Sequence, residues 1–289
     1  MGVYSIKDLE NFTQIKAHTL RIWEQRYNLL NPERTDTNIR FYSDRDLKKI
    51  LNINLLYNNG VKISKIAKLS DTEIVEEASK ILNEPIANDI EGAERIINKI
   101  MLYDETGIRE DLESLYIKHD FEVIFSDLLI PVLHKIGELW QVDSITISHE
   151  HFFSNIIRSF MLRKTEEYHK TNPNKHKVLL FLGENEYHEL GLLYYNYLLN
   201  KRGYETVYLG QSVPLDDLKI AVQTIKPCYI FTSLTAKMDE KEFNRFFEQL
   251  DDCFDLSKVY AGGYQMNFHK DLVPERVKTI NHTDDIDLI

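Results

Sequence analysis

The sequence predicts a multidomain chain of 289 residues with three segments of different fold class. Residues 1–70 show short amphipathic helices, residues 75–170 are helical throughout, and residues 175–289 alternate strands with helices. The last pattern predicts an α/β doubly wound parallel sheet, because parallel strands need a helical crossover between them. The first two segments are predicted to be all-α. A chain of this length can form two or three separate cores.

Composition excludes several classes of protein. No apolar run approaches the roughly 18 residues of a membrane span, and the N-terminus lacks the basic and then apolar pattern of a signal peptide. The two cysteines, Cys228 and Cys253, are too few for a disulfide framework. We therefore expect a cytoplasmic protein that makes no contact with a membrane.

The net charge of −11 is unevenly distributed along the chain. Residues 1–69 contain 12 Lys and Arg against 7 Asp and Glu, a net of +5, and the rest contains 23 against 39, a net of −16. Such asymmetry indicates a basic end that faces nucleic acid. The alternative is a mildly basic surface without a nucleic-acid partner.

Two short helices joined by a tight turn are predicted near the N-terminus. Ser5 is placed to cap the first, and after a break near Thr13-Gln14 the second runs from about residue 16 to residue 27. In a helix-turn-helix the second helix enters the major groove. Its face opposite the apolar stripe carries basic groups that can reach phosphates or guanine edges, namely Lys16, His18 and Arg21 beside Glu24 and Gln25.

A basic hairpin and two more helices follow. Residues 33–42 form a predicted hairpin with Arg34, Arg40 and Tyr42, which is typical of a wing that grips phosphates. Ser43-Asp44 then caps a third helix that ends at Asn59-Gly60, and apolar positions at 63, 66 and 69 mark a fourth.

Residues 1–70 resemble the winged helix-turn-helix DNA-binding domain of MerR-type transcription regulators. The matching parts are Thr19-Leu20-Arg21 with Trp23-Glu24, Pro32-x-Arg34-Thr35, Arg40-x-Tyr42, and Gly60 before Ile63-x-x-Ile66. The resemblance implies a double-stranded DNA operator as partner, contacted by Lys16, Thr19, Arg21, Arg34, Arg40 and Tyr42. The alternative is a small helical domain without DNA. Metal-sensing members carry cysteines in a long dimerising helix, and none lies nearby here.

The middle segment predicts a helical bundle with breaks near Asn83-Glu84-Pro85, Thr106-Gly107 and Val142-Asp143. Trp140 is followed, after nine intervening residues, by Glu150-His151 at the start of the next helix. These side chains can line one side of a pocket. The alternative is a half-buried tryptophan over the end of the bundle and a surface Glu-His pair.

The C-terminal segment predicts four or five parallel strands. We expect strands at residues 178–182, 205–209, 228–231 and 258–261, with a fifth at 277–280, and helices at 189–201, 214–225 and 239–250. The loops after the first, third and fourth strands share one rim of such a sheet. They carry Glu186-x-His188-x-x-Gly191, Ser233-x-Thr235 and Gly262-Gly263.

In this order the three loops resemble the flavodoxin-like cobalamin-binding domain, whose pattern is Asp-x-His-x-x-Gly, Ser-x-Leu or Ser-x-Thr, and Gly-Gly. The resemblance implies that His188 ligates the cobalt from below and that Glu186 fixes its other nitrogen. Gly191 would allow close helix packing, Ser233 and Thr235 would bond the displaced nucleotide tail, and Gly262-Gly263 would approach it closely. Glu186 is a departure, since the family pattern has aspartate there.

The whole chain resembles the cobalamin-dependent MerR-type photoregulators of the CarH and LitR group. In that group a four-helix bundle caps the corrin with a Trp and a Glu-His pair, which match Trp140, Glu150 and His151. The resemblance implies a cytoplasmic repressor and photoreceptor, not an enzyme. It would bind adenosylcobalamin or methylcobalamin and form a homo-oligomer, a dimer or a tetramer.

Gln141 is a second departure, because light-sensing members have there a histidine that captures cobalt after illumination, and an amide is a poorer cobalt ligand. Either the photoproduct differs, or cobalamin is sensed without that trap, or His149 or another group substitutes. Two other functions stay open, a corrinoid carrier or methyltransferase subunit and a regulator that has lost the cofactor.

Overall fold

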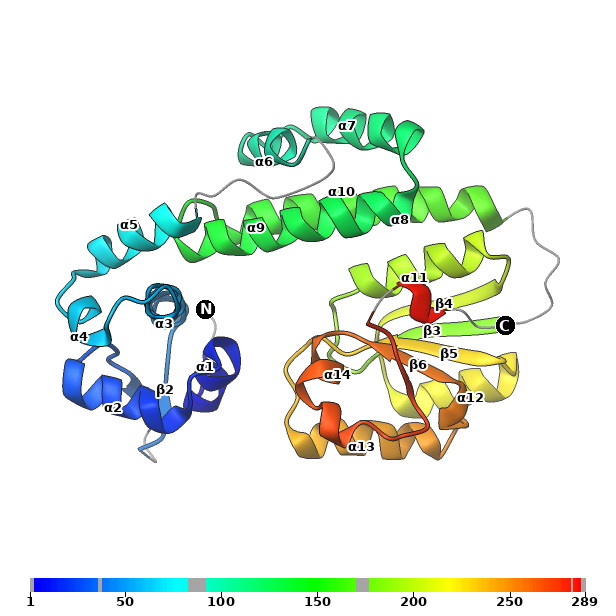
Figure 1. Cartoon of the computed structure of the whole chain (residues 1–289). Helices are drawn as coiled ribbons and strands as arrows, with labels where there is room; N and C mark the ends of the chain where they lie inside the picture. The colour runs from blue at the N-terminus through cyan, green and yellow to red at the C-terminus, as the bar shows by residue number, and fades with distance from the viewer. Residues whose placement is uncertain (1–2, 36–37, 83–91, 170–176, 282, 287–289) are drawn as a thin grey trace. The chain divides into compact units, whose positions relative to one another are not determined.

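A computed structural model of the chain describes residues 3–35, 38–82, 92–169, 177–281 and 283–286 (Figure 1). The chain divides into two compact units, Met1–Phe152 and Phe153–Ile289. The expected break at Asn83-Glu84-Pro85 lies outside the described residues. None of the described helices combines the length and the apolar character needed to cross a membrane.

The N-terminal domain has the predicted helix-turn-helix and wing. Ser5 and Asp8 form a capping box at the start of the first helix, and Gln14 ends it in the left-handed region with φ of 59°. A second capping box, between Ser43 and Asp46, starts the third helix. The elements are α1 (Ile6–Thr13), α2 (Ala17–Tyr27), β1 (Glu33–Arg34), β2 (Arg40–Phe41), α3 (Asp44–Asn58) and α4 (Ile63–Ile66).

One apolar core holds this domain together. Leu20 and Trp23 of α2 pack with Ile50 and Ile53 of α3, and all four are at most 5% exposed. The antiparallel pairing of β1 with β2 puts Glu33 opposite Phe41 and forms the wing. The helix spacing predicted from the sequence is confirmed for α2 and α3, whose apolar positions form the buried face, whereas the expected apolar position Phe12 of α1 is 50% exposed.

The rest of the first unit is helical. Its elements are α5 (Asp71–Leu82), α6 (Ala93–Met101), α7 (Glu105–Lys118), α8 (Phe121–Ile124), the π-helical segment η1 (Phe125–Leu129), α9 (Ile130–Gln141) and the start of α10 (Ile147–His169). The break expected at Val142-Asp143 is confirmed. The break expected near Thr106-Gly107 lies slightly earlier, at residues 102–104 between α6 and α7. Gly107 itself lies in the first turn of α7 and donates its backbone N–H to the capping Asp104 carboxylate.

The π-helical turn has a local cause. Pro131 follows it within the first turn of α9 and lacks a backbone N–H, so it cannot complete the ordinary helical ladder. The backbone N–H of Ile130 instead reaches back five residues to Phe125. A π-bulge of this kind keeps the helix continuous through a proline, which periodicity alone does not reveal.

The second unit contains the predicted parallel sheet. Its strands have the order β4-β3-β5-β6-β7, and each strand is parallel to its neighbours in this order. This is the 2-1-3-4-5 order of flavodoxin-like domains. The strands are β3 (Lys177–Gly183), β4 (Glu205–Val213), β5 (Tyr229–Ser233), β6 (Val259–Gly262) and β7 (Lys278–Thr279).

Helices cover both faces of this sheet. One face carries α11 (Leu190–Lys201), and the other carries α12 (Leu215–Ile225) and α13 (Glu240–Asp251), as Figure 1 shows. Phe181 and Ile230 of the sheet pack with Phe243 and Phe246 of α13 in a buried apolar core. The strand expected to end at 209 continues to Val213 through Gly210, whose φ of +83° breaks the register. Short α14 (Tyr264–Phe268), η2 (Leu256–Lys258), η3 (Lys270–Leu272) and η4 (Thr283–Ile286) were not predicted.

Candidate functional site

The three predicted loops meet at the carboxyl edge of the sheet. Gly183 ends β3, Ser233 ends β5, and Gly262 ends β6, where it pairs with Ser233. The neighbours β3 and β5 lie where the strand order reverses, the position at which open α/β sheets bind ligands. The three loops therefore lie on the rim where the sequence predicts them.

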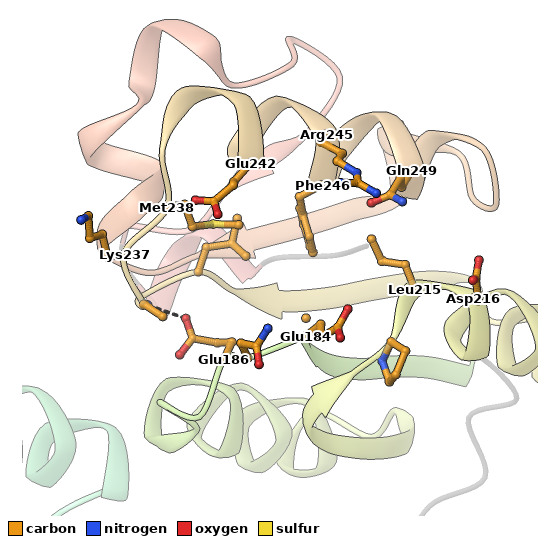
Figure 2. Close-up of a pocket in the computed structure, with 15 residues that line it drawn as sticks. Glu184, Glu186, Leu215, Asp216, Lys237, Met238, Glu242, Arg245, Phe246 and Gln249 are labelled. Carbon is orange, nitrogen blue, oxygen red and sulfur yellow. Dashed lines mark hydrogen bonds between the residues drawn. The ribbon is translucent and has the colours of Figure 1, made fainter. Parts of the chain in front are cut away.

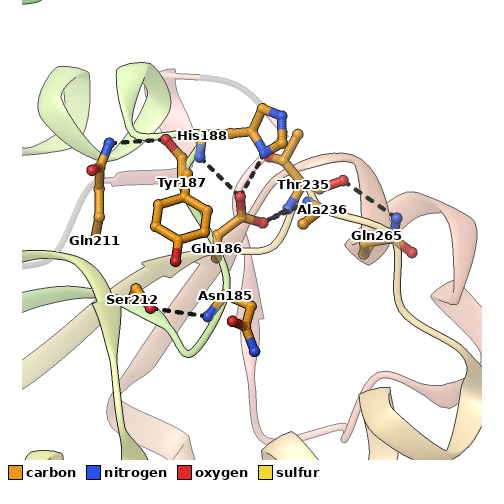
Figure 3. Close-up of polar contacts among 9 residues, drawn as sticks. All are labelled: Asn185, Glu186, Tyr187, His188, Gln211, Ser212, Thr235, Ala236 and Gln265. Carbon is orange, nitrogen blue, oxygen red and sulfur yellow. Dashed lines mark hydrogen bonds and ion pairs between the residues drawn. The ribbon is translucent and has the colours of Figure 1, made fainter. Parts of the chain in front are cut away.

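The pairing expected between Glu186 and His188 is confirmed. The His188 Nδ1 lies 2.6 Å from Glu186 Oε1, and the backbone N–H of His188 donates to the same oxygen at 2.9 Å (Figure 3). An ionised carboxylate on Nδ1 requires the proton there, so the lone pair of the neutral ring lies on Nε2. The His188 side chain is 64% exposed and Glu186 only 6%.

Glu186 also joins two loops. Its second carboxylate oxygen accepts the backbone N–H of Thr235 at 2.7 Å and that of Ala236 at 2.5 Å, both beyond the end of β5. Burial alone would raise the pKa of this carboxyl, but the hydrogen bonds from His188, Ala236 and Thr235 outweigh it and lower the pKa to about 2. The carboxylate is therefore ionised and fixed at neutral pH.

A second strand steadies the same loop from its other side. Ser212 of β4 accepts the backbone N–H of Asn185 through its hydroxyl and donates its own backbone N–H to the Glu186 carbonyl oxygen. Gln211 donates its amide to the Tyr187 carbonyl oxygen at 3.0 Å. Sequence reasoning missed both residues, because the strand was expected to end at 209. Gly210 and Ser212 have positive φ values, so the end of this strand is irregular, and no sequence motif predicts it.

Two glycines of the site are required by packing within the chain. A Cβ on Gly263 would lie 2.5 Å from the Leu234 carbonyl oxygen, and one on Gly262 would lie 2.1 Å from the Tyr195 hydroxyl oxygen. A Cβ on Gly191 would lie 3.6 Å from the Ser233 hydroxyl oxygen, an ordinary contact. Close helix packing alone therefore does not require glycine at 191, which corrects the reason given for it above.

A cavity of about 490 Å³ opens beside the His188 loop. Figure 2 shows it between the Gly183–Glu186 turn and α13, with Phe246, Met238 and Arg245 among its lining side chains. Ser233 is 3% exposed, whereas the Thr235 side chain is partly accessible. The buried Gln265 Oε1 has no hydrogen-bond partner in the described structure, and its amide nitrogen lies 3.4 Å from the Thr235 carbonyl oxygen.

The residue after His188 belongs to a separate polar cluster. Glu189 pairs with Arg158 of α10 and accepts the Tyr208 hydroxyl at 3.1 Å. Burial and the Glu189 carboxylate both raise the pKa of the Tyr208 hydroxyl. The cluster ties the first turn of α11 to α10 and to β4, and so restrains the helix that begins beside His188.

The predicted cap residues lie in the first unit. Glu150 and His151 are adjacent on α10, and their side chains pair at 2.6 Å, with the His151 side chain 66% exposed and that of Glu150 41%. Trp140 packs against the core of the N-terminal domain, with the Lys48 ammonium 4.3 Å from the centre of its ring. Gln141 bonds Asn52 of α3. The tryptophan is thus half-buried, as expected if it only covers the end of the bundle.

His149, a proposed substitute ligand, has a local structural role. Its Nδ1 accepts the backbone N–H of Thr146 at 3.1 Å at the start of α10. The ring stacks on Tyr103 at a centroid distance of 4.4 Å. Because Nδ1 is the acceptor, the ring carries its proton on Nε2, which is the form that does not offer that nitrogen to a metal.

Among the six residues predicted to contact DNA, exposure differs. Lys16, Arg21 and Arg34 are exposed, and Thr19 is partly so. Arg40 is held by Glu24 of α2 at 3.0 Å. The structure contradicts the expectation for Tyr42, which is 1% exposed and donates its hydroxyl to Glu24 at 3.2 Å. Tyr42 therefore orients the Glu24–Arg40 pair from inside the core.

Within the described residues, no cluster of three or more His, Cys, Asp or Glu side chains is arranged to hold a metal ion. The rim can instead offer a metal one imidazole nitrogen of fixed tautomer, beside a cavity of ligand size. That donor set suits a metal whose other ligands come with an organic cofactor.

Two family models match the chain. One, described as MerR HTH family regulatory protein, matches residues 4–73, and one described as B12 binding domain matches residues 92–163. The second range includes Trp140, Glu150 and His151.

Known proteins also match over most of the length. The HTH-type transcriptional repressor CarH of Myxococcus xanthus is 27% identical over 273 residues, 92% of this chain and 91% of CarH. The repressor CarA of the same organism is 25% identical over 260 residues, 89% of this chain and 85% of CarA. The monomethylamine corrinoid protein of Methanosarcina barkeri matches in fold, with a TM-score of 0.51 and 16% identity over 64% of this chain and 89% of that protein.

Proposed function

The chain joins a MerR helix-turn-helix domain to a B12-binding domain and is homologous to the CarH and CarA repressors, and from this we propose that it is a DNA-binding transcription regulator controlled by bound cobalamin. These homologues are transcriptional repressors rather than enzymes. As part of the proposal, the protein acts in the cytoplasm on a double-stranded operator and assembles as a dimer or tetramer.

The observation that carries the cofactor assignment is the 2.6 Å contact between His188 Nδ1 and the ionised Glu186 carboxylate, which favours the tautomer with a free Nε2. If cobalamin is bound, His188 would hold its cobalt through Nε2, because Nδ1 is taken by Glu186, and the corrin would supply the cobalt chemistry. Glu186 holds the ring, and the Gln211–Ser212 strand end holds its loop. The Glu in place of Asp is therefore compatible with ligation, because its longer side chain still bonds Nδ1.

The remaining predicted contacts complete the proposal. The cavity lined by Leu234, Ala236 and Phe246 would take part of the nucleotide tail. The neighbouring loop residues Ser233, Thr235, Gly262 and Gly263 would contact the rest of it. Trp140, Glu150 and His151 would contribute from the bundle. The absence of a side chain at Gly191 would allow the bound cofactor to approach the backbone closely, and it would not serve helix packing. Lys16, Thr19, Arg21, Arg34 and Arg40 would meet the operator.

Regulation follows from linkage. A ligand that binds one arrangement of the chain better than another shifts the population toward it, and DNA affinity changes by the same factor that DNA exerts on ligand affinity. We propose that adenosylcobalamin or methylcobalamin favours the repressing form, and that light acts through adenosylcobalamin.

The test is reconstitution of the full-length protein with adenosylcobalamin in the dark, followed by desalting and a visible spectrum. We expect a corrinoid spectrum to stay with the protein, and His188→Ala to reduce uptake or shift the axial-ligand features. His134→Ala is the matched control, since His134 is exposed on α9. A colourless wild-type protein would refute the cofactor assignment.

A corrinoid carrier and a regulator without cofactor are the competing functions. Selection of duplex DNA by the protein from a random pool tests the carrier function. A corrinoid carrier that binds no operator would enrich no sequence. A protein that shifts the selected duplex but takes up no cobalamin would be the second.

A further inference from the structure

Helix α3 of the N-terminal domain is bonded to the end of α9 through a reciprocal pair of amides. The Gln141 Nε2 donates to Asn52 Oδ1 at 2.8 Å, and the Asn52 Nδ2 donates to the Gln141 backbone carbonyl at 3.3 Å. The two residues are 89 positions apart in the chain. Neither bond belongs to the proposed DNA contact or to the proposed cobalt ligation.

Asn52 is an unusual residue for its position. It is 1% exposed and adjoins the buried Ile53 of the domain core. A buried amide is costly unless its groups are bonded, so its partner on α9 is part of what allows asparagine here. Gln141 therefore has a structural reason in this chain, at the position where light-sensing members of the resembling group carry histidine.

Lys48, one turn earlier on α3, makes the second half of the contact. Its ammonium lies 4.3 Å from the centre of the Trp140 ring and 2.6 Å from Asp143 Oδ1, and its side chain is 17% exposed. A cation on an aromatic face is held more strongly when it is partly removed from water. We name the set Lys48, Asn52, Trp140, Gln141 and Asp143 the α3–α9 joint.

From the joint, α3 reaches the helix-turn-helix directly. Asn54 donates its amide to the Thr13 carbonyl at 3.0 Å, at the turn between α1 and α2. Tyr57 packs edge-on against Trp23 of α2 at 5.3 Å. The residues that hold the bundle and those that hold the DNA-binding turn are therefore within about two helical turns of one another on one rigid element.

We propose that the α3–α9 joint transmits the state of the cobalamin site to the DNA-binding helices. The inference rests on the proposed function, because Trp140 is both a joint residue and a proposed cofactor contact. A cofactor that changes the position or freedom of Trp140 changes the neighbouring contacts with Lys48 and Asn52. If the joint carries this change, weakening it alters the coupling free energy between cofactor and DNA, which has the same value in both directions.

The joint itself is tested without cofactor or DNA. Full-length protein is compared with Gln141→Glu, an isosteric change that removes the donor to Asn52, and with Gln141→Ala. Hydrogen–deuterium exchange is followed in α3 and in α9. We expect faster exchange in both helices, and no change in Gln223→Glu, the same substitution on the exposed face of α12. Unchanged exchange in both helices would overturn the joint.

Transmission is tested by DNA affinity with and without adenosylcobalamin, on the duplex selected from the random pool. Cofactor coupling in proteins is commonly about fivefold or more. We expect Gln141→Glu to bring the ratio of the two affinities toward one while cobalamin uptake, read from the spectrum, is retained. A ratio equal to that of wild type overturns the transmission.

Two variants guard against misfolding and against failure of the premise. Asn52→Asp keeps the oxygen that accepts from Gln141 and removes only the amide donor. Lys48→Met removes the ammonium and keeps most of the aliphatic side chain. If a Gln141 variant loses its helical circular dichroism, either of these variants is used in its place. Absence of cobalamin uptake by wild type would count against the proposed function, whereas the exchange experiment would still decide the joint.

Discussion

Glu186 carries one methylene more than the aspartate of the resembling family, and this length has a use. One oxygen serves His188, while the other reaches two backbone N–H groups beyond β5. We expect that a shorter aspartate held at His188 would not reach both loops. The departure thus adds an anchor between β3 and β5 loops without removing the histidine contact.

The first prediction concerns Glu186→Gln. The folded pKa of about 2 lies below the ordinary 4.5, so ionised Glu186 stabilises the fold fully above pH 4.5, and this contribution is lost as pH falls toward 2. The difference corresponds to about 3 kcal/mol at most. We expect Glu186→Gln to be less stable than wild type at pH 7, with the gap narrowing at pH 3, in urea unfolding followed by circular dichroism.

Glu186→Asp is the matched variant for the same position. It keeps the charge and shortens the reach, so we expect retained His188 contact but faster hydrogen exchange at Thr235 and Ala236. If Glu186→Gln and wild type differed equally at pH 7 and pH 3, the carboxylate would not be the stabilising group.

Gln141 leads to a second prediction at residue scale. Its amide is a weak cobalt ligand and is already bonded to Asn52. We expect illumination of the adenosylcobalamin-loaded protein to yield no stable bis-histidine adduct. Visible spectra before and after illumination, with free adenosylcobalamin as control, check this, and a stable bis-histidine spectrum contradicts it.

Among elements, the helix caps illustrate what sequence can and cannot predict. Ser5 and Ser43 were placed correctly, because a capping residue acts on a backbone group only three positions away. The start of α7 was misplaced, since Gly107 suggested a break. Its absent Cβ instead leaves room for Asp104, whose carboxylate oxygen lies 2.2 Å from where that atom would be.

Two glycines in helices give a third prediction with a built-in control. Gly107→Ala would displace the Asp104 cap, and losing a cap costs about 1 kcal/mol. Gly137 of α9 has open space around its Cβ position, so Gly137→Ala should stabilise by about 0.5–1 kcal/mol through helix propensity. Thermal unfolding should shift in opposite directions, and a shift of the same sign for both would exclude the cap explanation.

Long-range contacts set the limit of the sequence argument. The three loops could be placed on one rim because topology alone brings the carboxyl ends of parallel strands together. The contacts from Gln211 and Ser212, and the pairing of Asn52 with Gln141, depend on side-chain positions that no periodic pattern encodes. Tyr42 matches the family motif and was expected to contact DNA, but the motif does not reveal that its side chain is buried.

At the scale of the whole molecule, part of the positive charge of residues 1–69 is neutralised by ion pairs within the chain. Lys48 pairs with Asp143, while Lys49 and Arg45 pair with Asp71. The hydrogen bond from Lys49, together with Arg45, lowers the pKa of Asp71. Three of the basic groups in residues 1–69 thus join α3 to acidic residues beyond it, so the net of +5 overstates what faces DNA.

The last prediction separates DNA-facing arginines from those used internally. Arg21 is exposed on α2, whereas Arg45 on α3 pairs with Asp71 at 3.0 Å. A phosphate contact releases counterions, so its loss lowers the slope of log affinity against log salt by about 1. We expect Arg21→Ala to weaken binding of the selected duplex and reduce this slope, and Arg45→Ala to leave the slope unchanged, in anisotropy titrations across salt concentrations. An equal loss of slope in both variants would show that Arg45 also meets DNA and that its pairing with Asp71 yields to phosphate.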